Sequence, residues 1–433
     1  MNATNTPPAD YFAPRFPQKL EELDVSIAFL TDLALKTMAA DADCSTASIA
    51  TRLRLGMIIT DMLLKRLNNE RFIETKGVIG LHNHQYAMLD RGWERNNLLL
   101  GLCSYVGSAP VSLTAYTDLT TKQTQCRTPV TQSSLNKALA GLVLADDVKE
   151  SLGLVASSGR SLFLSGPSGN GKTAMAHSLA DAIEGTLWMP YAIEVDGHVI
   201  RMFDAHTHHK VADAGPDVDR RWVKVRTPFV VAGGELTLTD LDLYRTDTPR
   251  FYEAPFQMKS NGGVLLIDDL GRQRCSAKQL LNRWIIPLEN HVDYLTLSTG
   301  QKIQVPFEQL VVFATNLTEP DLADEAFLRR MGYRLYVTAP TVETFTEIFQ
   351  HCAKSFSLPV AAEIIDQVLA CYRADNRVLK CCDPRDLILR TLEVCKYRQQ
   401  APRLDTEILG VAWKSYFGTA AGALAVDSRA KAG

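Results

Sequence analysis

The residues best suited to chemistry form one continuous run: Gly166, Pro167, Ser168, Gly169, Asn170, Gly171, Lys172 and Thr173. An apolar segment, 161–165, precedes this run, and a helix-like segment, 174–183, follows it. The glycines permit backbone torsions that turn successive N–H groups into an anion-binding concavity. The start of the following helix adds positive potential. Lys172 can contact β- and γ-phosphates and the Thr173 hydroxyl can ligate Mg²⁺, so the spacing predicts a phosphate-binding loop between a strand and a helix.

Two carboxylates end a second apolar segment, 262–267, and these are Asp268 and Asp269. A continuous apolar run is typical of a central parallel strand, and ligands of parallel sheets bind beyond the carboxyl ends of the strands. Asp268 is therefore expected beside the phosphate-binding loop, where it can hold Mg²⁺ through water. Asp269 is expected to orient and deprotonate the attacking water.

Four further polar residues follow in an order that suits the same site. Asn316 ends a third apolar strand, 309–315, and its amide can hydrogen-bond the γ-phosphate or the water. Arg329 and Arg330 precede a strand at 333–337, and Arg385 begins a helix. The alternative for the arginine pair is a solvated helix end. The alternative for Arg385 is a structural ion pair.

The order of these parts resembles the AAA+ ATPase superfamily over about residues 135–400. The run 166–173 matches its Walker A motif, and 265–269 matches its Walker B motif. Asn316 matches sensor 1, the pair 329–330 lies where the arginine finger lies, and Arg385 matches sensor 2. The usual acidic pair of the family is Asp-Glu, whereas this chain has Asp268-Asp269. This departure puts the rate of turnover in more doubt than nucleotide binding.

The resemblance implies a homo-oligomeric ring, a hexamer in most relatives, with ATP bound between neighbouring subunits. An arginine of one subunit then reaches the γ-phosphate held by the next, and Arg330 is favoured over Arg329 for this role. The implied ligands are ATP and Mg²⁺, with Thr173 and Asp268 on the metal. Catalysis is assigned to Asp269, Asn316 and the arginine pair, and nucleotide binding to 166–173 and Arg385.

Composition limits the classes of protein to which the chain can belong. Of its 433 residues, 46% are hydrophobic and 22% are charged, and the net charge is −3. These values are typical of a globular protein and argue against sequence-independent nucleic-acid binding, which needs a basic face. No apolar run is long enough to span a bilayer, and the amino terminus does not resemble a secretory signal. The nine scattered cysteines favour free thiols in a reducing cytoplasm.

The fold expected is α/β, with a parallel-sheet core of the P-loop AAA+ kind and a helical lid. A small winged-helix α+β domain is expected to precede the core. The predicted domain boundaries run in chain order: a flexible arm at 1–19, the winged-helix-like domain at 20–116, a linker at 117–131, the core at 132–339 with a β-hairpin insertion at about 188–250, the lid at 340–418 and a disordered tail at 419–433. Within the insertion, Asp196-Gly197 and Gly233-Gly234 are expected to be hairpin turns.

The domain at 20–116 invites a DNA-binding interpretation, because a winged helix places its third helix in the major groove. That helix, at about 57–69, carries Met57, Ile58, Asp61 and Met62 on its leading face. Residues 1–100 contain eleven Lys or Arg and twelve Asp or Glu. An apolar leading face on a domain of about neutral charge favours contact with protein over contact with DNA.

The sequence therefore predicts an ATP-hydrolysing AAA+ ring ATPase that remodels or assembles a protein partner in the cytoplasm. One alternative is a DNA-directed ATPase, such as a transcription regulator or helicase loader. The other alternative is an assembly scaffold gated by nucleotide, with little turnover.

Overall fold

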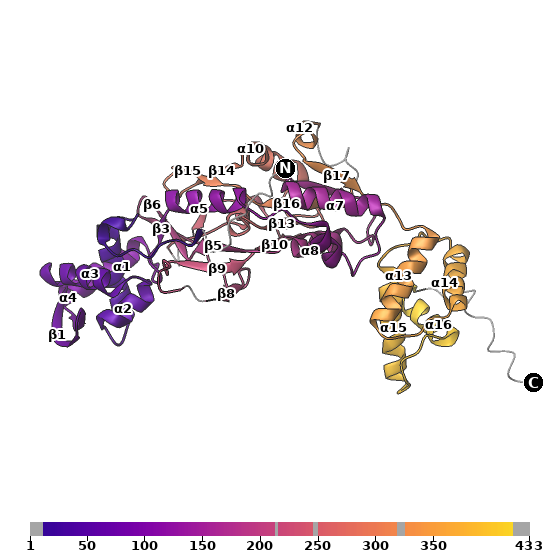
Figure 1. Ribbon diagram of the computed structural model, residues 1–433, viewed down its shortest axis with the longest axis horizontal. Coiled ribbons are helices and arrows are strands. Elements are labelled where there is room, and N and C mark those ends of the chain that lie inside the picture. Colours follow the sequence, from indigo (N-terminus) through magenta and orange to yellow (C-terminus); the bar gives the residue numbers. More distant parts are fainter. Residues whose placement is uncertain (1–11, 213–214, 246–249, 318–324, 419–433) are drawn as a thin grey trace, which may run out of the picture.

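A computed structural model describes residues 12–212, 215–245, 250–317 and 325–418. Figure 1 shows an elongated molecule, with the amino-terminal helices at one end, a sheet in the middle and the carboxy-terminal helices at the other end. The predicted tail at 419–433 and the first eleven residues of the predicted arm lie outside the described residues. Among the described helices, none has the length and apolar character that crossing a bilayer requires.

The central sheet is parallel throughout, with strands in the order β10-β13-β16-β4-β17. Its strands are β4 (Leu162–Ser165), β10 (Phe229–Ala232), β13 (Val264–Ile267), β16 (Leu310–Ala314) and β17 (Tyr333–Tyr336). Strands β4, β13 and β16 are buried along their whole length, which explains why they read as continuous apolar runs. The α/β core expected from the sequence is therefore confirmed.

Helices cover both faces of this sheet and contribute to its two hydrophobic clusters. These helices are α6 (Gln132–Ala138), α7 (Asp146–Ser158), α8 (Lys172–Ala182), α10 (Ala277–Asn290) and α12 (Glu325–Leu328). On one face, Met175, Ala176 and Leu179 of α8 pack in the same cluster as Leu164 of β4. On the other face, Trp284 of α10 packs in the second cluster, which is formed by the strand side chains that point to that face. The phosphate-binding loop is thus anchored between a buried strand and a buried helix.

The amino-terminal elements are three helices, a two-stranded hairpin and a fourth helix. They are α1 (Ile27–Ala39), α2 (Thr46–Leu53), α3 (Met57–Asn69), β1 (Ile73–Gly80), β2 (Asn83–Met88) and α4 (Asp90–Leu102), after the short 3₁₀ helix η2 (Leu20–Glu22). The two strands form a hairpin that is paired from Ile73 opposite Met88 as far as Gly80 opposite Asn83. The winged-helix assignment itself stays a prediction.

The prediction of a linker at 117–131 is wrong for residues 117–125, which are helical. Residues 113–125 form helix α5 (Leu113–Gln125), which Ser112 caps through its side chain. Tyr116 and Thr120 of this helix are buried, and the Asn261 side chain donates to the Tyr116 hydroxyl oxygen at 2.7 Å. The polar sequence of the segment concealed a helix whose inner face packs on residues far along the chain.

The predicted insertion at 188–250 is also wrong at its carboxy-terminal boundary. Its first hairpin turn is present at Asp196-Gly197, between β6 (Ala192–Val195) and β7 (His198–Arg201). The second hairpin is absent, because β10 pairs with β13 as an edge strand of the core sheet. The term insertion is used below for residues 183–228, between α8 and β10. It also contains β5 (Thr186–Pro190), β8 (Lys210–Ala212) and β9 (Trp222–Arg226).

A second five-stranded sheet, β11-β12-β7-β6-β3, joins the insertion to neighbouring segments. Its other strands are β3 (Val111–Ser112), β11 (Tyr244–Arg245) and β12 (Tyr252–Glu253). A separate hairpin pairs β14 (Val292–Thr296) with β15 (Lys302–Pro306), and η3 (Leu238–Leu241) and α9 (Phe256–Lys259) lie between β10 and β13. The described part of the predicted arm is ordered against the insertion, because Phe16 N donates to Asp217 O and Asp219 N donates to Pro14 O.

Arg221 joins the amino-terminal domain to the insertion. Its buried guanidinium donates to Asp24 at 2.8 Å, to Pro110 O at 3.1 Å and to Asp219. Burial by itself would raise the pKa of Asp24, but Arg221 and the Ser112 N–H together hold that pKa below its usual value. Burial disfavours the charged form of Arg221, yet its two carboxylate partners raise its pKa. The pair therefore ties the two parts of the chain together in its ionised form.

Asp24→Asn is expected to lower stability at neutral pH by on the order of 1 kcal/mol, because it removes the charge that faces Arg221. The pKa of Asp24 is lower in the folded protein than in the unfolded chain, so its contribution is complete above the unfolded value and is lost as the pH falls through the folded value. The difference between variant and wild type should therefore disappear in acid. Urea unfolding at pH 7 and near pH 3 measures both values, and a difference of equal size at the two pH values would contradict this assignment.

The carboxy-terminal region from residue 340, called the lid here, contains four helices around its own hydrophobic cluster. They are α13 (Val342–Ser355), α14 (Ala362–Ala374), α15 (Asp383–Tyr397) and α16 (Thr406–Phe417). The hydroxyls of Tyr372 and Tyr416 donate to the buried Asp383 carboxylate at 2.6 and 3.0 Å. These bonds fix the first turn of α15, where Arg385 lies.

Candidate active site

Three neighbouring strands of the core sheet bring the candidate residues to one edge. The loop 166–171 follows β4, Asp268 and Asp269 follow β13, and Asn316 follows β16 after one residue. These strands are adjacent and parallel, so their carboxyl ends meet. The structure thus brings together the Walker A, Walker B and sensor 1 residues that the sequence placed in one site.

The loop has the backbone shape that its glycines suggested. Gly166 has φ +138°, and a Cβ there would lie 2.1 Å from the carbonyl oxygen of Val337. Gly169 has φ +84°, and a Cβ there would lie 2.9 Å from the Cys382 Sγ. Side chains at these two positions would collide with the residue after β17 and with the lid, so both positions require glycine.

Lys172 is buried and makes three hydrogen bonds at the first turn of α8. Its Nζ donates to Gly166 O at 2.8 Å, to Pro167 O at 2.9 Å and to Asn316 Oδ1 at 2.7 Å. Burial lowers the pKa of Lys172, while the charges of Asp269 and Asp268 oppose that shift. The ammonium is therefore held in place inside the loop and is aimed at the sensor 1 amide.

Asn316 connects Lys172 to the Walker B carboxylate, because its Nδ2 donates to Asp269 Oδ1 at 2.8 Å. Thr173 makes a second link, since its hydroxyl lies 3.1 and 3.0 Å from the two carboxylate oxygens of Asp268. Lys172 is thus linked to Asp269 through Asn316, and Thr173 contacts Asp268 directly. A hydroxyl and a carboxylate oxygen at this separation are ligand types that Mg²⁺ prefers, so Thr173 and Asp268 fit that ion.

Asp269 has φ +49°, a conformation in which Asp and Asn are enriched among residues other than glycine. Gln273, which the sequence did not single out, supports this turn by donating from Nε2 to Asp268 O at 2.8 Å and to Asp269 O at 3.2 Å. A glutamate would fit such a backbone less well, which is a physical reason for Asp in place of the usual second acid. The role of Gln273 is visible only in these contacts of the folded chain, because no sequence motif includes it.

The arginine pair lies outside this network and near the surface. Arg329 is exposed, and the half-buried Arg330 donates from Nε to a carboxylate oxygen of Glu289 at 2.9 Å. Glu289 lies at the end of α10, and the sequence gave no sign of this contact. Both arginines precede β17, which pairs in parallel with β4, so they lie at the amino end of the sheet strands, whereas the loop 166–171 lies at the carboxyl end.

The backbone of the lid contacts the phosphate-binding loop, whereas the described contact of the Arg385 side chain is with Asp386. Cys382 N donates to Gly169 O at 2.9 Å, and Cys381 N donates to Asn170 Oδ1 at 3.3 Å. The Arg385 side chain is 63% exposed and contacts Asp386 at 3.3 Å. The structural ion pair that was the alternative for Arg385 is therefore present in the described residues, and a role toward nucleotide stays a prediction.

Comparisons with known proteins agree with this architecture. Residues 162–339 match the family model described as "ATPase family associated with various cellular activities (AAA)", and residues 341–415 match a domain of unknown function (DUF8689). No curated protein matches the chain. The parallel sheet with its phosphate-binding loop defines a P-loop α/β protein. The family match then shows that residues 162–339 are an AAA+ ATPase domain.

Solved structures give weaker likenesses. One is the Thermotoga maritima RuvB Holliday junction branch migration motor, at 16% identity and a TM-score of 0.36, covering 66% of this chain and 70% of that one. Another is NtrX from Brucella abortus in complex with ATP, at 14% identity and a TM-score of 0.38, covering 59% of this chain and 52% of that one. At such scores the family assignment depends on the match over 162–339.

Proposed function

We propose that this chain binds and hydrolyses ATP as a homo-oligomeric AAA+ ring, a hexamer, that remodels or assembles a protein partner in the cytoplasm. The observation that carries the proposal is the continuous set of contacts from Lys172 through Asn316 to Asp269, beside the Thr173–Asp268 pair. These contacts gather a phosphate-binding cation, a metal-ligand pair and a candidate base at one sheet edge.

Binding of the triphosphate is assigned to the loop 166–171, Lys172 and Thr173. The loop N–H groups and the start of α8 favour an anion, and Lys172 supplies a positive charge that is already positioned. When bound, Mg²⁺ would be held by Thr173 and Asp268 and would neutralise charge on the phosphates. Because the cation and the loop are preorganised, little reordering opposes ATP binding.

Activation of the attacking water is assigned to Asp269. Its carboxylate is oriented by the Asn316 amide, and its backbone is held in the turn with φ +49°, so its free oxygen has a defined direction. Asn316 contacts both Lys172 and Asp269, and it can therefore report the presence of a γ-phosphate to the base. This arrangement fits the positioning and electrostatic roles that phosphoryl transfer requires.

The arginine that would contact the γ-phosphate is assigned to a neighbouring subunit. Arg330 and Arg329 lie just after α12 and before β17, at the opposite end of the sheet strands from the loop of their own chain. In a ring, a head-to-tail interface would bring such a surface to the next subunit's loop. Arg330 is the preferred finger and Arg329 the second choice, and release of Glu289 would accompany assembly. Arg385 would contact nucleotide after a movement of the lid.

Contact with a protein partner is favoured by the exposed face of α3. Met57, Ile58 and Met62 are 39%, 52% and 46% exposed, so they do not belong to the core of the domain. The hairpin tip nearby adds the exposed residues Val78 and Leu81. An apolar surface of this kind suits a protein contact better than the reading of polar base edges.

DNA is the second candidate partner, because Asp61 does not lie on the exposed face as the sequence analysis expected. Its buried carboxylate contacts Lys65 at 2.8 Å, His82 at 3.1 Å and His84 at 3.3 Å. Burial would raise the pKa of Asp61, yet its contacts with Lys65, His82 and His84 lower it. Its charge is thus compensated inside the domain and would not repel phosphates.

Two assays of the full chain separate these candidates. Steady-state phosphate release with Mg²⁺ and ATP distinguishes an active ATPase from a scaffold with little turnover. Gel-shift titration with duplex DNA at moderate salt distinguishes the partner classes. Sustained turnover without tight, sequence-selective DNA binding is expected, and tight selective binding would overturn the preference for a protein partner.

A further inference from the structure

A pocket lies beside the amino ends of the core strands, whereas the candidate active site lies at their carboxyl ends. It has an open mouth and a cavity volume of about 130 Å³. Thr227 and Gly262 line it, and they precede β10 and β13 by two residues each. The phosphate-binding loop follows the carboxyl end of β4, which is parallel to these strands. The pocket is therefore a separate site, located where α5 and the insertion meet the core.

Arg127, directly after α5, brings a positive charge to this pocket. Its Nη2 atom is buried and has no hydrogen-bond partner among the described residues. Burial lowers the pKa of Arg127 to about 10, so the guanidinium is still charged at neutral pH. Glu184, the acid that also lines the pocket, lies 3.6 Å from Lys137 and forms its ion pair there. A half-buried guanidinium whose Nη2 lacks a hydrogen-bond partner among the described residues is unfavourable, which points to an anion supplied from outside.

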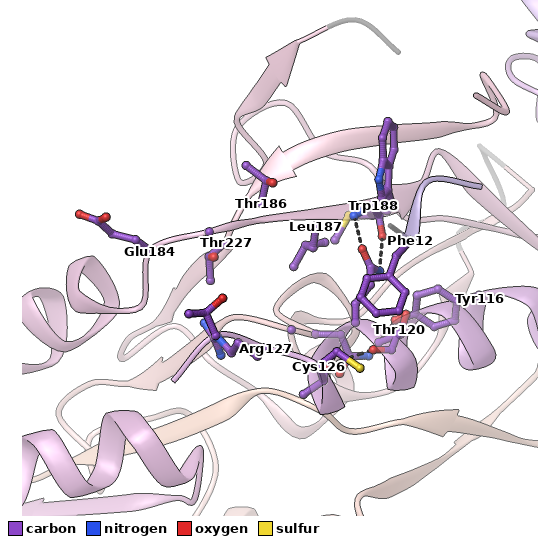
Figure 2. Close-up of a pocket in the computed structure, with 17 residues that line it drawn as sticks. Phe12, Tyr116, Thr120, Cys126, Arg127, Glu184, Thr186, Leu187, Trp188 and Thr227 are labelled. Carbon is purple, nitrogen blue, oxygen red and sulfur yellow. Dashed lines mark hydrogen bonds between the residues drawn. The ribbon is translucent and has the colours of Figure 1, made fainter. Parts of the chain in front are cut away.

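The other end of the pocket is aromatic. Figure 2 shows the rings of Phe12 and Tyr116 next to each other, the Trp188 indole directed away from them, and Arg127 apart. The Gln123 side chain holds the backbone of Trp188 on both sides, accepting from its N–H at 2.6 Å and donating to its carbonyl at 3.0 Å. Tyr116 is fixed by its contact with Asn261. This end of the pocket is thus rigid before any ligand enters.

We propose that this pocket binds a small organic monocarboxylate with an aromatic or apolar body. The carboxylate would pair with the Arg127 guanidinium, whose planar fork matches two carboxylate oxygens. The body of the ligand would pack against Phe12 and Tyr116. Most ligand pockets combine an apolar lining with a few polar groups that fix orientation, and this pocket has that composition.

The charge of the pocket favours one negative charge over two. Arg127 is the cation that lines it among the described residues, and Glu184 lies at the same wall. A phosphate dianion would meet only one compensating charge, together with threonine hydroxyls such as that of Thr227. A carboxylate matches the single guanidinium, and no covalent step is involved.

The test uses 4-phenylbutyrate as the probe and its neutral amide, 4-phenylbutyramide, as the matched ligand control. Calorimetric titration of the full chain measures affinity, and thermal unfolding measures stability. Arg127→Met keeps most of the side-chain volume and removes the charge. Arg160→Met is the protein control, because Arg160 is exposed and lies at the same edge of the sheet, just before β4.

Wild type and Arg160→Met are expected to bind the carboxylate at least about tenfold more tightly than the amide, because only the carboxylate makes a charge-assisted pair. Arg127→Met should lose that preference. It should also unfold at a higher temperature than wild type when no ligand is added, because a half-buried charge with an unpartnered buried nitrogen has been removed. A purely structural Arg127 would give the opposite shift.

Three results would overturn the proposal. They are equal binding of acid and amide by wild type, an acid preference that survives in Arg127→Met, and a fall in the unfolding temperature of ligand-free Arg127→Met. Inorganic phosphate serves as a further probe, and tighter binding of phosphate than of 4-phenylbutyrate would show that the pocket takes a different anion. None of these results depends on ATP hydrolysis.

Discussion

Asp269→Asn is expected to lower the rate of ATP hydrolysis by about 10²–10⁴-fold while leaving ATP binding intact. The substitution removes the basic oxygen and keeps the shape of the side chain. Asn also tolerates the φ of +49° at this position, so the turn after β13 should be preserved. The substitution removes a negative charge beside the phosphates, so ATP binding should be unchanged or stronger. Single-turnover phosphate release and a nucleotide titration measure the two quantities.

Asp196→Asn is the matched control for this prediction. Asp196 has the same φ of +49° and lies in the exposed turn between β6 and β7, away from the candidate site. It should hydrolyse ATP at the wild-type rate. If Asp269→Asn also turns over at the wild-type rate, Asp269 is not the base and the role of the Asp268-Asp269 pair must be reassigned.

Arg330→Ala is expected to lower hydrolysis by about 10³-fold, the lower end of the range for arginine fingers. ATP binding by the loop should be retained, because Arg330 precedes β17 and therefore lies at the opposite end of the sheet strands from the loop. Glu289→Gln is the control, since it breaks the same ion pair while leaving the arginine in place. An exposed pair of this kind contributes little to stability, so Glu289→Gln should keep its activity. Equal losses in the two variants would assign Arg330 a structural role.

Mixing experiments test whether Arg330 acts on the neighbouring subunit. Lys172→Met lacks the loop cation and Arg330→Ala lacks the finger, so each variant alone should be inactive. In randomly mixed rings, about a quarter of the shared sites would combine an intact loop with an intact finger, and activity should reappear. No recovery from rings that do mix would show that the arginine acts within its own chain, or has no catalytic role.

The parts of the site that the sequence predicted are those encoded in short, continuous segments. The run 166–173 and the acids after 262–267 carry their own backbone requirements and lie directly after buried strands. Parallel pairing of β4, β13 and β16 then brings their ends together without further information. Asn316 was found by the same reasoning, although its contacts with both Lys172 and Asp269 appeared only in the structure.

The features that sequence analysis missed depend on long-range packing. Helix α5 is polar on its outer face and was interpreted as a linker, because its burial arises from partners such as Asn261 and Trp188. Strand β10 pairs with β13, more than 30 residues later, rather than with the strand that precedes it. Asp61 was placed on the exposed face of α3, but its partners His82 and His84 lie on the hairpin. Local periodicity cannot choose between such alternatives.

Equilibrium binding of ATP in the presence of Mg²⁺ tests the central claim most directly, because every other role depends on the loop 166–173 holding a triphosphate. Lys172→Met is the test variant, and Lys278→Met, at an exposed position of α10, is the control. Wild type and the control are expected to bind ATP with the same affinity, and Lys172→Met at least about 100-fold more weakly. Absence of binding by the wild-type chain, or equal binding by a folded Lys172→Met, would contradict the account.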